Sequence, residues 1–115
     1  MGARYRVIVD WTASYADPIT LAAGEGLTLT GAQEIWDGHR WLWARNAAGR
    51  EGWVPDSLVE VGEDGIRARS AYSAVELSCR RGERLEALEE THGWVRCRAE
   101  SGATGWVPLR YVSPC

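Results

Sequence analysis

Tryptophan is the residue type in this sequence best suited to form a binding site. The chain holds seven tryptophans in 115 residues, more than small hydrophobic cores can enclose. A Gly-Trp-Val-Pro segment occurs at 52–55 and again at 105–108, and Trp41 and Trp94 precede it at the same spacing, so both pairs are 53 residues apart. Exposed aromatic patches usually mark binding sites. The sequence therefore predicts non-covalent recognition on flat aromatic faces.

Residue types that could support catalysis or bind a metal are present but poorly arranged. His39 and His92 occupy equivalent turns without a carboxylate or cysteine nearby in sequence. Cys79, Cys97 and Cys115 form no Cys-x-x-Cys pair, and we expect Cys79 and Cys97 to be small buried hydrophobic residues in the reduced state. There is no nucleophile–base arrangement, no phosphate-binding glycine loop and no assignable acid–base pair of carboxylates. We expect a non-enzymatic protein without cofactor or metal.

The elements that position these aromatic residues occur twice along the chain. AAGEGLTLT (22–30) aligns with RRGERLEAL (80–88), upstream of the two aligned tryptophans. Short alternating apolar and polar segments are separated by glycine-containing turns, which is typical of small all-β domains. ERLEALEE (83–90) could also be a helix, but its counterpart GLTLTGAQ (26–33) favours a strand, so we predict strands in both copies.

The boundary between the copies is predicted at VGEDG (61–65), a segment with two glycines and Val61 as its one bulky residue. We therefore expect a first domain at residues 1–60, a linker at 61–65 and a second domain at 66–115.

The order of these motifs resembles the Src-homology-3 (SH3) family, in two tandem copies. The first copy is similar to the family pattern at VIVDW (7–11), PITL (18–21), Gly24-Glu25, Trp41 and GWVPDSLV (52–59). The second copy is similar at ELSC (76–79), Gly82-Glu83, GWVRCR (93–98) and GWVPLRYV (105–112). The resemblance covers nearly the whole chain and implies two small five-stranded β-barrels.

The resemblance also implies an aromatic groove on each barrel that accepts a polyproline II peptide, which arrives pre-ordered. Acidic residues of the RT loop, which follows the first strand in this family, would pair with a basic residue of the peptide. The candidate ligand-binding residues are Trp11, Asp17, Trp36, Trp41, Pro55, Leu58, Tyr72, Trp94, Pro108 and Tyr111. Trp53 and Trp106 are expected to pack structurally, and Pro55 and Pro108 to end their strands.

Several positions depart from the family pattern. In the first copy, Trp11 and Leu58 stand where the family has tyrosines, and Asp17 remains as the acidic residue of the RT loop. The second copy has Ser70 at a tyrosine position and a shortened RT loop with almost no acidic residue. Trp36 could either line the groove or fold back as a plug, and both alternatives remain open.

Composition restricts the classes of partner. The net charge of −3 argues against a nucleic-acid binder, and no apolar run is long enough for a membrane span. The 13 basic residues are all arginine and phenylalanine is absent, which suggests GC-rich coding and a bacterial source. The sequence predicts a cytoplasmic module that binds a peptide or partner protein, with proline-containing peptides among the candidate ligands; a homodimer is compatible with it. Two alternatives are a bacterial cell-wall-binding module and a structural accessory subunit whose aromatic faces a partner covers.

Overall fold

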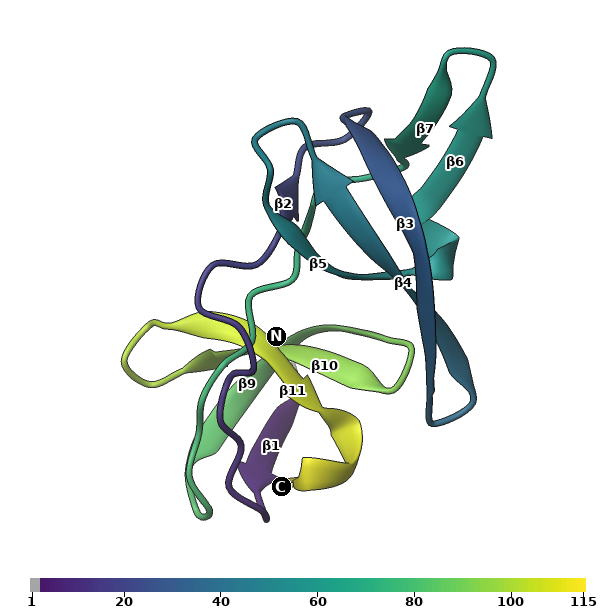
Figure 1. The fold of residues 1–115 in the computed structure, drawn as a ribbon. Coiled ribbons are helices and arrows are strands. Elements are labelled where there is room, and N and C mark those ends of the chain that lie inside the picture. The colour runs from purple at the N-terminus through teal and green to yellow at the C-terminus, as the bar shows by residue number, and fades with distance from the viewer. Residues whose placement is uncertain (1–2) are drawn as a thin grey trace. The chain divides into compact units, whose positions relative to one another are not determined.

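β-Strands form nearly all the regular structure of this protein. The computed structural model describes residues 3–115 and contains, within them, strands and two three-residue 3₁₀ helices (Figure 1). The strands are β1 (Arg4–Val7), β2 (Thr20–Leu21), β3 (Gly26–Trp36), β4 (His39–Asn46), β5 (Glu51–Pro55), β6 (Val59–Gly62), β7 (Gly65–Ala68), β8 (Tyr72–Ser73), β9 (Arg84–Thr91), β10 (Trp94–Ala99), β11 (Thr104–Pro108) and β12 (Val112–Pro114). The 3₁₀ helices η1 (Asp56–Leu58) and η2 (Leu109–Tyr111) follow β5 and β11. No helix of the described residues could cross a membrane. The all-β prediction is confirmed.

The chain divides into two compact units that do not coincide with the two sequence copies. The central unit comprises residues 17–74, and the terminal unit combines residues 3–16 with residues 75–115. The chain therefore passes from one unit to the other twice, between residues 16 and 17 and again between 74 and 75. The predicted domains 1–60 and 66–115 describe the sequence copies, whereas each compact unit takes segments from both copies.

The predicted linker at 61–65 lies inside the central unit. Strands β6 and β7 pair there as an antiparallel hairpin in which Gly62 is opposite Gly65. Gly65 has a φ of 120°, a conformation that residues with a side chain rarely adopt. A glycine-rich composition is typical of a flexible linker and of a tight hairpin turn alike, and here it forms the turn.

The central unit is built on a five-stranded sheet in the order β5-β4-β3-β7-β6. In β3 the side chains of GLTLT alternate between the two faces of the sheet, so that Leu27 is buried in the interior. Ala44 of β4 and Val54 of β5 are buried in the same core. Its core consists of Ile19, Leu21, Leu27, Ala44, Val54, Leu58 and Ala68.

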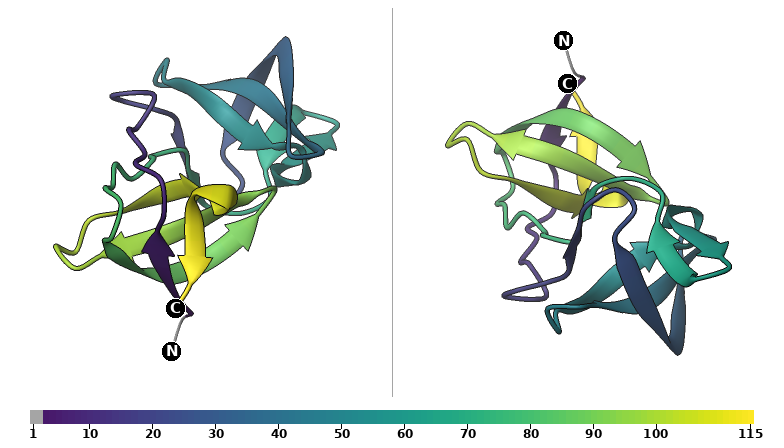
Figure 2. Two further views of the ribbon diagram at one scale, coloured as in Figure 1. Left: turned by 90° about the horizontal axis from the view of Figure 1, so that it is seen from below. Right: turned by 90° about the horizontal axis from the view of Figure 1, so that it is seen from above.

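The terminal unit has the equivalent sheet in the order β11-β10-β9-β1-β12. Strand β1, from the first copy, lies between β9 and β12 of the second copy, as the purple strand among the green and yellow ones in Figure 2. Its core consists of Val7, Leu77, Cys79, Leu85, Val95, Cys97, Val107 and Val112.

Each unit therefore contains the N-terminal segment, or arm, of the sequence copy that supplies most of the other unit. The arm of the terminal unit is residues 3–16 and includes β1. Within it, the backbone of Trp11 exchanges two hydrogen bonds with Cys79, at 2.9 and 2.8 Å. The arm of the central unit runs from β7 to β8, where Tyr72 pairs with Leu21. Trp11 and Tyr72 are thus at equivalent places in the two units.

Candidate functional site

Three partly exposed aromatic rings meet in the terminal unit. Trp11 is 5.4 Å from Trp94 and 5.2 Å from Tyr111 between ring centroids, and both contacts are edge-to-face, with interplanar angles of 78° and 87°. Such pairs contribute roughly 0.5–1.5 kcal/mol beyond the burial of their area. The three rings fix one another while each keeps part of its surface accessible. We call this cluster, together with Glu76 beside it, the Trp11 site.

Local backbone structure explains how the rings are placed. Trp94 begins β10 after a turn in which His92 has a φ of 52° and Gly93 a φ of 82°. Pro108, directly opposite Trp94, ends β11 and precedes η2, and that helical turn carries Tyr111. Pro108, predicted to contact the ligand, is itself fully buried and exposes no surface to one. The prediction that Pro55 and Pro108 end their strands is confirmed.

Glycine is required at the start of the second Gly-Trp-Val-Pro segment. A Cβ atom added to Gly105 would lie 2.6 Å from backbone atoms of both Glu76 and Leu77. The segment that holds Glu76 therefore crosses directly over β11, where Glu76 forms a bridge with Trp106. This close approach brings the Glu76 side chain to the aromatic rings.

Glu76 is a partly buried carboxylate held by the arm of the other copy. Its Oε1 accepts hydrogen bonds from the backbone N–H of Ser14 at 3.0 Å and from the Ser14 hydroxyl at 3.1 Å. Burial raises the pKa of Glu76, and the Ser14 hydrogen bonds and the nearby Trp11 indole partly lower it again. The buried Trp11 Nε1 forms no hydrogen bond of standard geometry, so its effect on Glu76 is one of proximity.

Sequence reasoning missed Glu76. The sequence pattern predicts almost no acid in the second RT loop, and ELSC (76–79) serves there only as a match to the family pattern. The signal available in the sequence was the acidic side chain of Glu76, which directly precedes Leu77, a residue that the structure buries.

The equivalent region of the central unit is more closed. Trp41 is only 6% exposed, and Leu58, at 7%, belongs to the hydrophobic core. Pro55 lies opposite Trp41 and is buried as well. Tyr72 is partly buried and donates its hydroxyl hydrogen to the carbonyl of Trp53 at 2.9 Å. Trp41 and Leu58 therefore expose less surface than their counterparts Trp94 and Tyr111.

Two further predicted site residues of the first copy, Asp17 and Trp36, also belong to the central unit. Asp17 has a 72% exposed side chain, and its carboxylate lies 3.3 Å from the Arg50 guanidinium. Trp36 ends β3 just before the turn at Asp37 and Gly38, and it is partly buried. Trp11, predicted with these residues, lies instead with Trp94 and Tyr111.

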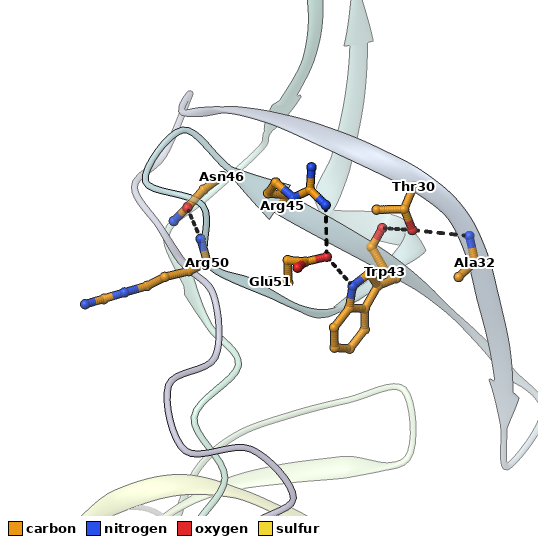
Figure 3. A network of polar contacts seen from close by, with 7 residues as sticks. All are labelled: Thr30, Ala32, Trp43, Arg45, Asn46, Arg50 and Glu51. Carbon is orange, nitrogen blue, oxygen red and sulfur yellow. Dashed lines mark hydrogen bonds and ion pairs between the residues drawn. The ribbon is translucent and has the colours of Figure 1, made fainter.

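The central unit also contains a pair of tryptophans, Trp43 and Trp53, which is held by polar contacts. Trp43 and Trp53 lie opposite each other on β4 and β5 with centroids 4.9 Å apart. The Trp43 indole donates a hydrogen bond of 2.8 Å to Glu51, which also accepts one from Arg45 at 3.5 Å (Figure 3). Asn46 stabilises the adjoining turn by accepting a hydrogen bond from the backbone of Arg50 at 3.0 Å. These contacts favour a structural role for the pair, as predicted for Trp53.

The cysteines provide no reactive thiolate in the interior. Cys79 and Cys97 are buried and unpaired, as predicted, and Cys115 is exposed. Burial raises the pKa of Cys79 to about 11, with a smaller effect of Glu83, and burial likewise raises the pKa of Cys97 to about 11. Within residues 3–115, no three histidine, cysteine or acidic side chains gather as metal ligands would.

Comparison with known protein families agrees with the repeat. The model of the variant SH3 domain family matches residues 4–62 and, a second time, residues 66–115. The chain therefore belongs to the variant SH3 family and carries two tandem copies. Domains of this family are non-catalytic modules that generally mediate protein–protein interaction. No curated protein and no solved structure matched the chain.

Proposed function

We propose that this protein is a non-enzymatic interaction module and that its Trp11 site binds an extended peptide segment of a partner protein. The observation that carries the proposal is the meeting of Trp11, Trp94 and Tyr111 beside a partly buried carboxylate. Rigid aromatic rings supply apolar contact area at a small loss of side-chain entropy.

The shape of the ligand follows from the aromatic rings. Edge-to-face rings leave flat faces at steep angles to one another, and such faces accept proline rings or other compact apolar side chains. A proline-rich segment is already extended before it binds, so it loses little conformational entropy. We therefore propose a proline-containing segment as the preferred ligand.

The charge of the ligand follows from Glu76. A cation close to this carboxylate would favour its ionised form and offset the unfavourable effect of burial. Ser14 already donates two hydrogen bonds to one oxygen, Oε1, so we assign the second oxygen to the ligand. The peptide should carry arginine or lysine next to its apolar residues.

The proposed interaction takes place in the cytoplasm of a bacterium. The all-arginine basic composition supports a bacterial source. Three free cysteines suit a reducing compartment.

The proposal is tested by calorimetric titration of the whole chain with a panel of proline-containing peptides, each offered with arginine or with alanine beside the prolines. We expect Trp94→Ala to abolish binding of the best peptide and Glu76→Gln to remove the preference for arginine. Glu100→Gln makes the same charge change in an exposed turn of the same unit and should leave both unaffected.

If no peptide of the panel bound, or if Glu76→Gln and Glu100→Gln behaved alike, the proposed ligand would be wrong. Circular dichroism of each variant separates a lost site from a lost fold.

A further inference from the structure

The two arms occupy the same place in the two units, although each comes from the opposite sequence copy. The backbone N–H of Val7 donates to the carbonyl of Glu83 at 2.9 Å, and that of Ala68 donates to Glu25 at 2.9 Å. Val7 lies opposite Val112, and Ala68 lies opposite Val59. Backbone pairing is therefore the same at these positions of both units, so it does not distinguish the two arms there.

Side-chain size does distinguish the two arms. Val7 shares its core with Cys79, whereas Ala68 shares its core with Leu21. Cys79 and Leu21 are equivalent residues, since each pairs with the aromatic residue of its arm. The larger arm residue therefore accompanies the smaller core residue, and the smaller arm residue accompanies the larger one.

The opposite assignment would disturb both cores. If each arm stayed with its own sequence copy, Val7 would join Leu21 and Ala68 would join Cys79. The first combination overfills a core and the second leaves a cavity, and both are destabilising. The observed assignment keeps the summed side-chain volumes of the two cores closer to each other.

The arm also brings binding residues with it. Trp11 and Ser14 enter the terminal unit only through the arm of the first copy, and they meet Glu76 and Trp94 of the second copy there. With its own arm, the second copy would present Tyr72 in place of Trp11.

We propose that the exchange of arms within one chain is encoded by these core sizes and that the Trp11 site is consequently built by both copies together. The identity of the site as a peptide site rests on the proposed function above, whereas the exchange itself does not. Tandem copies are then needed for one site, and they are not two independent binders.

Cross-linking of the whole chain tests the exchange, because strands β1 and β7 have opposite partners in the two arrangements. Arg6 lies opposite Ser113, and Arg67 lies opposite Glu60. In the alternative arrangement Arg6 would lie opposite Glu60, and Arg67 opposite Ser113. Four double-cysteine variants, one for each pair, are treated with a short bifunctional thiol reagent. Cys115→Ser serves as the background, because Cys79 and Cys97 are buried.

Arg98→Cys with Thr104→Cys provides the positive control, because these residues are opposite each other within one copy in either arrangement. We expect Arg6–Ser113 and Arg67–Glu60 to link within single chains as efficiently as the control, and the two alternative pairs to link at least ten times less. The proposal is overturned if the alternative pairs link, if the expected pairs fail while the control links, or if the products are covalent dimers.

Encoding by size is tested with the variant Val7→Ala plus Ala68→Val, which reverses the two arm residues. We expect the Arg6–Ser113 link to fall and the Arg6–Glu60 link to rise. An unchanged pattern would show that these core sizes do not select the arms. None of these measurements uses a ligand, so absence of peptide binding would contradict the proposed function and leave the exchange intact.

Discussion

Trp11 lies edge-on to Trp94 with 5.4 Å between ring centroids, although the two residues are 83 positions apart in the chain. The contact joins the first sequence copy to the second inside one compact unit. It forms because the arm that follows β1 pairs with the segment at Cys79. A binding site in this protein therefore depends on which arm a unit receives, as well as on the residues of its own copy.

Removal of the Trp11 ring should weaken peptide binding to the terminal unit. We expect Trp11→Ala to raise the dissociation constant roughly 30-fold, about 2 kcal/mol, because aromatic anchors of this kind are typical hot spots. Isothermal titration with the best peptide of the panel measures this effect. Ile35→Ala, at a 63% exposed residue of the central unit, is the matched control and should bind normally. Equal affinity of the two variants would remove Trp11 from the site.

Trp41 and Trp94 should respond differently to truncation, although they align in sequence. Trp41→Ala should lower the free energy of unfolding by roughly 3–5 kcal/mol, the range for buried aromatic residues, because Trp41 is 6% exposed. Trp94→Ala should lower the free energy of unfolding less and affinity more, because its ring is partly accessible. Urea denaturation followed by circular dichroism compares the two. A smaller loss for Trp41→Ala than for Trp94→Ala would contradict this assignment.

The sequence was sufficient to predict strands, turns and the tandem SH3 organisation. Alternation in GLTLT and the repeated Gly-Trp-Val-Pro segment specify strand faces locally, and both occur in the structure as β3, β5 and β11. The assignment of arms could not be predicted, because both copies offer the same backbone pattern to either arm. The choice depends on side chains such as Val7 and Cys79 that meet only in the folded core.

The candidate site was predicted only in part, for a related reason. Trp94 lies opposite Pro108 in the terminal unit, and Trp94 and Tyr111 both contact Trp11. Trp11 joins them only because of the exchange, and Glu76 reaches the rings because its segment crosses Gly105. Motifs aligned copy by copy contain no information on such a crossing.

Gly105 should be intolerant of even a methyl group. We expect Gly105→Ala to lower the free energy of unfolding by about 1–3 kcal/mol, the range for overpacking, because the new Cβ would lie 2.6 Å from backbone atoms of Glu76 and Leu77. Gly52→Ala is the natural comparison, since its new Cβ would lie 2.9 Å from a side-chain atom of Ile19 and 3.2 Å from the Ile19 backbone nitrogen, a less severe overlap. Thermal unfolding of the two variants should place Gly105→Ala lower. The reverse order would mean that the segment at Glu76 does not cross β11 as closely as the structure shows.

The two buried thiols should make stability fall at alkaline pH. Burial raises the pKa of Cys79 and Cys97 to about 11, above the value of about 8.5 for an exposed thiol. The folded state therefore holds these protons more tightly than the unfolded state does. The resulting contribution to stability is fully present below about pH 8.5 and is lost progressively as the pH rises toward about 11. Urea denaturation at pH 8 and pH 10.5 should show this loss in the native chain. The loss should be smaller in the variant Cys79→Ala plus Cys97→Ala, whatever its stability at pH 8.

Thiol labelling provides a separate prediction for the three cysteines. At neutral pH a thiol reagent should label only Cys115 until denaturant is added. Rapid labelling of all three cysteines in the folded protein would contradict both the burial and the raised pKa values of Cys79 and Cys97.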